Sequence, residues 1–109
     1  MAGLDPATQT VHLAVMSQGH VYILASKRNG TLYIGVTNDL AARVFAHREG
    51  RGSVLTRRYG VRHLVWYEIY DMVVDAIQRE TSLKRWPRKW KLELIEKNNP
   101  DWNDLYDSF

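Results

Sequence analysis

The chain has 109 residues, no cysteine and a formal net charge of +3. This length suits a single domain around one core, and the lack of cysteine excludes both a disulfide framework and a zinc site built on thiolates. The four scattered histidines do not have the HxxxH spacing of a zinc-binding helix. The composition favours a cytoplasmic protein.

The first eighteen residues contain no lysine or arginine and show little periodicity. Their longest apolar run, VHLAVM, is too short for the core of a signal peptide or for a membrane span. We therefore expect residues 1–18 to form a flexible tail and residues 19–109 to form the folded domain. A membrane is not expected as a partner.

Two β-rich runs open the domain, HVYILAS at 20–26 and TLYIGV at 31–36. Asn29 and Gly30 lie between them, and both residue types tolerate the positive φ angles of a tight hairpin turn. The pattern predicts two antiparallel strands.

Two helical segments follow, a longer one over 40–49 and a shorter one over 54–60. Both are preceded by residues that favour helix caps, and glycines follow the first. The residues that can cap or end these helices are Asn38 or Asp39, Ser53, Gly50 and Gly52.

The run RHLVWYEIY at 62–70 is typical of a third strand, and helices are predicted over 72–86 and 88–98. The residues that open or end these helices are Asp71, Pro87 and the Asn99-Pro100 pair. The order ββααβαα with short links predicts a small α+β domain, in which helices flank a three-stranded, mostly antiparallel sheet.

Basic residues are unevenly distributed, since fourteen of the fifteen lysines and arginines fall within 27–91. Two clusters stand out: six arginines within 43–62, and six basic residues within 79–91 that Trp86 and Trp90 interrupt. This composition suits a surface that grips phosphates and offers planar rings. A solvated basic face with core tryptophans is the structural alternative.

Polar residues break the apolar stripe of two predicted helices. The stripes are Leu40, Arg43, Val44 and His47 on the first, and Val73, Ala76, Ile77, Glu80 and Lys84 on the long one. Polar residues at positions that should face the apolar core are expected at functional sites. Each residue also has a structural explanation: Glu80 can pair with Lys84, Arg43 can extend to solvent, and His47 can be a satisfied interior histidine.

Taken in order, four motifs carry a family resemblance: VYI, YIG, TNDLAARVFAH and RETSLKRW. They resemble the two triplets, the arginine helix and the glutamate motif of the GIY-YIG nuclease superfamily. The resemblance covers about residues 20–99 and is greatest to small single-domain bacterial members. The nuclease domain of the excinuclease C subunit is a more distant relative.

The resemblance implies a metal-dependent endonuclease that hydrolyses phosphodiester bonds in DNA, in repair or turnover. It implies that Tyr22 and Tyr33 line the active site, Arg43 contacts the scissile phosphate and His47 assists nearby. Glu80 would ligate one divalent ion, Mg²⁺ or Mn²⁺. RNA as a substrate and an additional protein partner both remain open.

Further residues are expected to contact nucleic acid or to complete the family pattern. Gly35, which lacks a side chain, would let the substrate approach the backbone closely, and Asn99 is the candidate for the family's late polar residue. The residues expected at the nucleic-acid surface are Gly35, Arg57, Arg58, Lys84, Arg85, Arg88 and Lys89.

Two positions depart from the family pattern. His20 stands at the glycine of the first triplet, and Val36 stands where some relatives have a catalytic lysine. The second departure leaves any role of that lysine unfilled. The alternative function is therefore a non-catalytic nucleic-acid-binding module of the same fold.

Overall fold

The computed structural model describes residues 17–109. Most of the predicted flexible tail, residues 1–16, lies outside the described residues, so that expectation stays a prediction. None of the helices within 17–109 is long and apolar enough to span a membrane.

The N-terminal hairpin consists of β1 (Gly19–Ala25) and β2 (Leu32–Thr37), which pair antiparallel as predicted. The turn uses its two signature residues differently from expectation. Asn29 has a positive φ of 57°, whereas Gly30 does not have a positive φ. Gly30 is needed for space instead, because a Cβ there would collide with Ser26 Oγ.

The two short helices are α2 (Leu40–Arg48) and α3 (Val54–Tyr59). Asp39 caps α2 and Ser53 caps α3, and each side chain accepts a hydrogen bond from a backbone N–H of the first turn. Gly50, with a φ of 77°, lets the chain leave α2 in a left-handed conformation. These boundaries agree with the sequence signals.

The second half of the chain forms β3 (His63–Tyr70), α4 (Val73–Arg85) and α5 (Arg88–Asn98). The prediction that Asp71 opens the long helix is wrong. Met72 occupies the N-cap position of α4 and makes no side-chain capping hydrogen bond.

A short 3-10 helix, η1 (Leu105–Ser108), was not predicted. The side chain of Asp104 ties this C-terminal segment to the domain. It pairs with Arg48 of α2 at 2.5 Å and accepts a hydrogen bond from the backbone N–H of Leu64 in β3 at 3.2 Å. Aspartates near the C-terminus therefore have a structural role that the sequence did not reveal.

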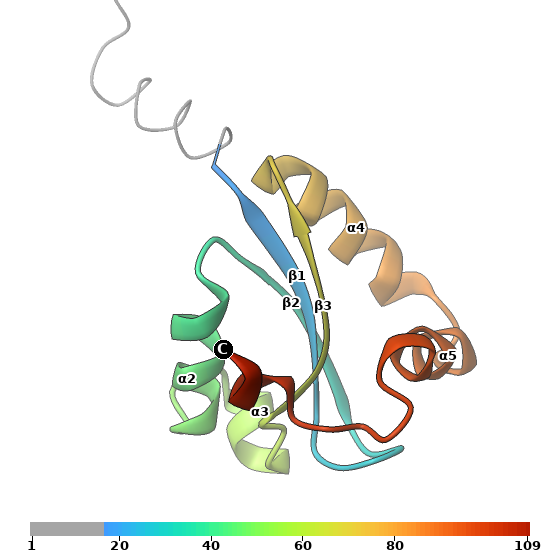
Figure 1. Ribbon diagram of the computed structural model, residues 1–109. Coiled ribbons are helices and arrows are strands. Elements are labelled where there is room, and N and C mark those ends of the chain that lie inside the picture. The colour runs from blue at the N-terminus through green and yellow to red at the C-terminus, as the bar shows by residue number, and fades with distance from the viewer. Residues whose placement is uncertain (1–16) are drawn as a thin grey trace, which may run out of the picture.

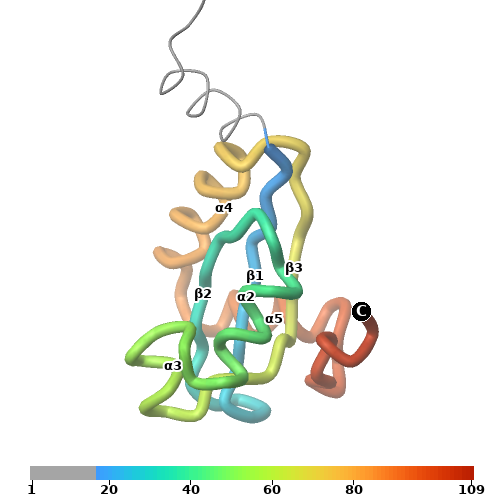
Figure 2. Tube along the Cα trace, turned by 90° about the vertical axis from the view of Figure 1, so that its left-hand side faces the viewer, coloured from blue at the N-terminus to red at the C-terminus, as the bar shows by residue number. Residues whose placement is uncertain are grey.

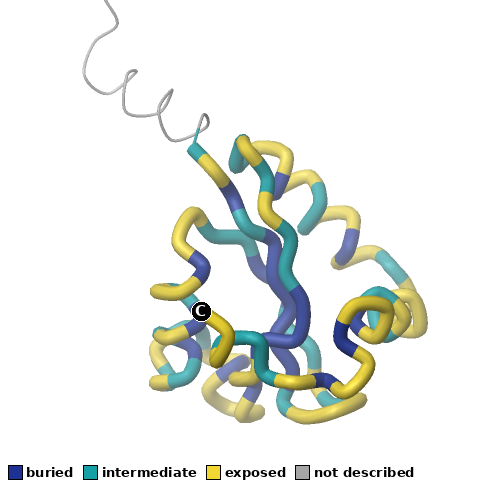
Figure 3. The backbone as a smooth tube through the Cα atoms, in the orientation of Figure 1, coloured by how far each residue is buried: buried dark blue, intermediate teal, exposed yellow. Residues whose placement is uncertain are grey.

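The sheet has the strand order β2-β1-β3, and both pairings are antiparallel. Figure 1 shows α2 and α3 on one side of the sheet and α4 and α5 on the other, and Figure 2 shows β2 at one edge. Central β1 is almost continuously buried (Figure 3). The predicted α+β class and element order are confirmed.

The two faces of the sheet support different cores. The face toward α4 and α5 is apolar and has at its centre Val21, Ile23, Ile34, Val65, Trp66, Ala76, Leu83 and Ile95. The face toward α2 and α3 combines Leu24, Leu40, Val44, Val61 and Leu64 with Tyr22. Tyr22 thus enters the core on the α2 side, where polar residues of α2 meet it.

Candidate active site

Tyr22 and Tyr33 lie on the same face of the hairpin, with ring centroids 6.2 Å apart. Tyr22 is only 1% exposed, whereas Tyr33 is half-buried. The Tyr22 ring lies across Gly35, because a Cβ on that glycine would collide with Tyr22 Cζ and Oη. The space that Gly35 leaves is thus filled by the protein's own phenol, a use that the sequence analysis did not foresee.

His47 projects from α2 between the two tyrosines, with its ring centroid 5.8 Å from Tyr22 and 5.1 Å from Tyr33. Its Nε2 is 3.0 Å from the Tyr22 hydroxyl, and its Nδ1 is 3.0 Å from Thr56 Oγ1. Burial, with the Arg43 cation adding to it, lowers the pKa of His47 to about 4. The imidazole is therefore neutral at physiological pH.

Arg43 lies one turn before His47 on α2, and its Nη2 donates a hydrogen bond to the Gly52 carbonyl oxygen at 2.8 Å. Interaction with the Tyr22 hydroxyl raises the pKa of Arg43, and Tyr33 acts in the same direction. Burial raises the pKa of Tyr22 to about 12, although Arg43 opposes the shift. Both phenols therefore lie beside one fixed cation.

Glu80 reaches the site from α4, which packs along β1 and β2. The Glu80 side chain is only 17% exposed. Its Oε1 is 3.2 Å from Nζ of Lys84, whose side chain is 55% exposed. The Glu80 charge is close enough to raise the pKa of Tyr22 as one of the smaller causes. The i, i+4 pair that the sequence offered as a structural alternative is present.

A divalent ion would depend on Glu80, because residues 17–109 contain no group of three or more histidine, aspartate or glutamate side chains that could hold a metal. Mg²⁺ is commonly bound by one or two carboxylates, with water and substrate phosphates completing its shell. A single partly exposed carboxylate such as Glu80 fits that kind of site. It does not fit a closed structural metal site.

Val36 lies on β2 beside Gly35 and packs against the apolar core on the α4 side. It contributes no amine to the site, so the role of the lysine found in some relatives is not filled by this position. His20, the other departure, has a buried Nδ1 without a hydrogen-bond partner among the described residues.

The predicted basic nucleic-acid residues all lie at the surface, but two of them are already engaged. Lys84 pairs with Glu80. The other exposed ones besides Arg88 are Arg57, Arg58, Arg85 and Lys89. Arg88 donates hydrogen bonds from Nη2 to the carbonyl oxygens of Asn29 and Gly30, at 2.8 and 2.7 Å. Arg88 therefore joins α5 to the hairpin turn.

Asn99 does not lie with the tyrosines. It is buried at the end of α5, where its Nδ2 donates to the carbonyl oxygens of Val65 and Asn103, and its Oδ1 accepts from the Asn103 backbone N–H. Because β3 and β2 are opposite edges of the sheet, these bonds place Asn99 away from Tyr33. Its observed contacts hold the C-terminal segment against β3.

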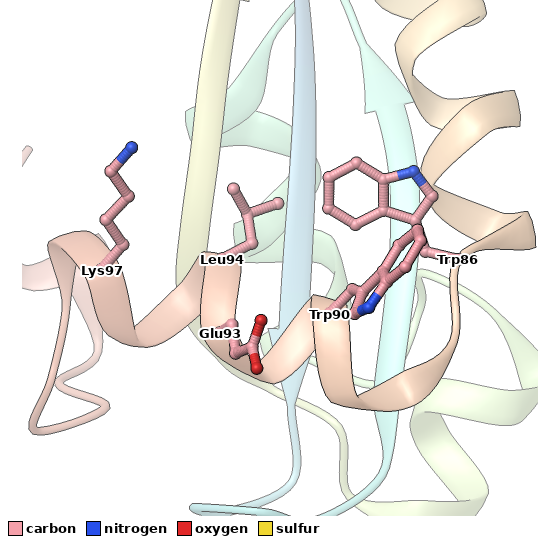
Figure 4. Close-up of a pocket in the computed structure, with 5 residues that line it drawn as sticks. All are labelled: Trp86, Trp90, Glu93, Leu94 and Lys97. Carbon is pink, nitrogen blue, oxygen red and sulfur yellow. The ribbon is translucent and has the colours of Figure 1, made fainter.

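The tryptophans of the second basic cluster meet edge to face near the start of α5, as Figure 4 shows, with centroids 5.9 Å apart. Trp86 packs against the apolar core, whereas Trp90 is 53% exposed. Together with Glu93, Leu94 and Lys97 they line a pocket of about 320 Å³. The pocket contains none of the residues gathered around Tyr22.

Two residues of the site were missed in the sequence. Gly52 was interpreted only as a helix stop, but a Cβ there would collide with the His47 ring, and its carbonyl holds Arg43. Thr56 is fully buried and contacts His47 Nδ1. The available signal was a threonine in the first turn after the Ser53 cap, which is too common a pattern to indicate a buried network.

Comparisons with known proteins place the chain in a family. UPF0213 proteins of Staphylococcus aureus strains Mu3 and N315 are each 37% identical over 81 residues, which cover 74% of this chain and 98% of theirs. The solution structure of the UPF0213 protein BH0048 from Bacillus halodurans is 28% identical, with a TM-score of 0.51 over 80% of this chain and 92% of that one. The GIY-YIG catalytic domain model matches residues 18–93, so the chain belongs to the GIY-YIG nuclease superfamily.

Proposed function

We propose that this protein is a divalent-metal-dependent endonuclease that hydrolyses phosphodiester bonds in DNA, in repair or turnover. The observation that carries the proposal is the cluster of Tyr22, Tyr33 and His47 on one face of the sheet, with Arg43 one turn away on α2. Glu80, on α4, adds a smaller electrostatic effect on Tyr22. An isolated strand tyrosine would not need a cation and a carboxylate from two helix layers.

Arg43 is the group suited to bind the scissile phosphate. Its guanidinium offers five donors in a rigid fork, and the Gly52 carbonyl fixes one end of that fork. A cation held in place before the reaction stabilises the charge that develops on the pentacovalent phosphorus.

The two tyrosines have different roles in this proposal. Tyr22 is buried and its pKa is raised to about 12, so its hydroxyl stays protonated and within the protein. Tyr33 is partly accessible and interacts with Arg43. We assign Tyr33 to contact and orient the attacking water through its hydroxyl, while Tyr22 and His47 help to position Arg43.

Glu80 would hold the divalent ion, together with water and phosphate oxygens. When bound, such an ion supplies Lewis-acid stabilisation of the departing oxygen. Exposed basic residues on α3 (Arg57 and Arg58) and on α4 and α5 (Arg85 and Lys89) would bind the flanking phosphates through charge. The same cleavage assays can be made with labelled RNA and with an added protein partner.

A non-catalytic nucleic-acid-binding module is the second candidate, and two observations favour it. Val36 fills the position of a catalytic lysine with a core residue, and Lys84 already pairs with Glu80. This candidate predicts salt-sensitive binding that requires neither Glu80 nor a metal.

The test is cleavage of labelled single-stranded, duplex and branched DNA with Mg²⁺, Mn²⁺ or EDTA, for wild type, Glu80→Ala and Glu80→Gln. The nuclease proposal expects metal-dependent cleavage that falls by on the order of 10³-fold or more in both variants. The exposed carboxylate change Glu96→Gln on α5 serves as the matched control. Equal cleavage by wild type and Glu80→Ala would refute the metal role, and binding without cleavage in every condition would favour the second candidate.

A further inference from the structure

A continuous set of buried polar contacts runs from the site into α3. His47 has a partner on each ring nitrogen, Tyr22 on Nε2 and Thr56 on Nδ1. Thr56 Oγ1 in turn lies 3.2 Å from the Ser53 carbonyl oxygen and 2.9 Å from Ser53 Oγ. Both His47 and Thr56 are fully buried, so the direction of these hydrogen bonds is fixed by the protein and not by water.

At the α3 end of the hydrogen-bond network, the Ser53 carbonyl oxygen favours one direction of the hydrogen bonds. A threonine hydroxyl has a single proton; the Ser53 carbonyl oxygen 3.2 Å away can only accept it, whereas the Ser53 hydroxyl 2.9 Å away can donate or accept. When Thr56 donates to that carbonyl, the lone pairs of Thr56 Oγ1 accept a proton from His47 Nδ1. A neutral histidine with its proton on Nδ1 leaves Nε2 as an acceptor.

The Arg43 end is compatible with the same direction. A guanidinium has donors and no acceptor, and the Arg43 cation affects the pKa of Tyr22, so in any contact between them the Tyr22 oxygen is the acceptor. The Tyr22 proton is then directed to His47 Nε2. Both ends of the network therefore agree on one arrangement of protons.

We propose that Thr56 is a positioning residue that fixes His47 as the Nδ1-protonated tautomer and thereby orients Tyr22 and Arg43. With the proton on Nε2 instead, His47 would donate to Tyr22, whose own proton would face the donors of Arg43. That arrangement would displace the guanidinium. The consequence for cleavage rests on the proposed function, whereas the tautomer itself does not.

The loop before α3 supports the same geometry. Gly52 brings its backbone against the His47 ring, since a Cβ there would collide with Nδ1, and its carbonyl oxygen accepts from Arg43. Ser53 caps α3 through the backbone N–H of Thr56. Residues 52–56 therefore hold both the arginine and the histidine of α2.

The test is the tautomer of His47 at neutral pH, read from long-range ¹H–¹⁵N correlation spectra of the full-length protein. The His47 signals are assigned by their loss in His47→Gln. Thr56→Val removes the hydroxyl at nearly constant shape, Thr56→Ser keeps it, and Thr31→Val changes an exposed threonine as the matched control.

Wild type, Thr56→Ser and Thr31→Val are expected to show the proton on Nδ1, and Thr56→Val is expected to move it wholly or partly to Nε2. On the DNA substrate that the cleavage assay identifies, kcat of Thr56→Val should fall by on the order of 10–100-fold with little change in KM. Thr56→Ser, which keeps the hydroxyl, should retain most of the wild-type kcat.

A wild-type proton on Nε2 would overturn the proposal, and this spectrum needs no variant to fold. Retention of the Nδ1 tautomer in a folded Thr56→Val protein would overturn it as well. A wild-type protein with the expected tautomer but no cleavage would count against the proposed function alone, because the tautomer is measured without substrate.

Discussion

The sheet has an apolar layer on one face and a polar network on the other. Toward α4 and α5, aliphatic and aromatic side chains such as Ile23, Leu83 and Ile95 are buried without polar partners to satisfy. Toward α2 and α3, the fully buried His47 and Thr56 have hydrogen-bond partners on both sides. The apolar face needs only volume and shape, whereas the polar face needs direction as well.

This difference shows where a small domain can carry chemistry. Burying polar groups costs free energy unless they are hydrogen-bonded, so a network of this kind survives only where each member has a partner. Substitutions on the two faces should therefore differ in kind: the apolar face should affect stability, and the polar face should affect both activity and the response to pH.

The largest expected effect is on the polar face. Arg43→Lys keeps the charge but removes the planar fork, so we expect DNA cleavage to fall by on the order of 10²–10³-fold. The measurement is kcat/KM at saturating metal. Arg62→Lys, an exposed arginine before β3, is the matched control; an equal loss in both variants would mean that the fork of Arg43 is not used.

The second effect distinguishes the two faces of the sheet by how stability responds to pH. Because the pKa of His47 falls from 6.5 unfolded to about 4 folded, the unfolded chain binds more protons between these values, and stability is lost as pH falls through this window. We expect a loss of about 2 kcal/mol between roughly pH 7 and pH 5, measured by urea unfolding.

His47→Gln should remove most of this pH dependence. Leu83→Ala, on the apolar face, should lower stability by about 3 kcal/mol and keep the wild-type slope, because it changes no titrating group. The same slope in wild type and His47→Gln would show that another group is responsible.

The smallest expected effect lies at the border between the faces. Lys84→Met removes the cation that competes for the Glu80 carboxylate, and partly exposed ion pairs contribute only about 0.2–1 kcal/mol. The metal concentration for half-maximal cleavage should therefore fall by no more than about 5-fold. Lys97→Met on α5 is the control, and a rise in the required metal would show that Lys84 helps the site instead of competing with it.

Local sequence signals predicted the elements well because they depend on neighbouring residues. The sequence predicted Asn38 or Asp39 as the cap of α2 and Ser53 as the cap of α3, and the structure shows Asp39 and Ser53 in these roles. The alternating apolar runs predicted all three strands. Asp71 was wrongly expected to cap α4, since a capping residue type can precede a helix without making the bond. The segment η1 has no strong local signal, because Asp104 holds it through contacts with α2 and β3.

The site was predictable in part. Arg43, His47 and Glu80 could be singled out because they interrupt apolar stripes, and in the structure His47 contacts Tyr22 while Glu80 pairs with Lys84. Asn99 and Arg88 could not be placed from sequence, because an amide or a guanidinium satisfies backbone carbonyls as readily as it binds a ligand. Their hydrogen bonds to β3 and to the hairpin turn appear only in the folded chain.

The sequence by itself determined the order of elements, the hairpin, the caps of α2 and α3, and the family to which the chain belongs. These features depend on residue type and spacing along the chain. The tertiary structure decided that Tyr22 lies over Gly35 and that Thr56 meets His47. The reason is that a hydrogen bond between residues far apart in the chain depends on how helices pack on the sheet, and that packing leaves no periodic mark in the sequence.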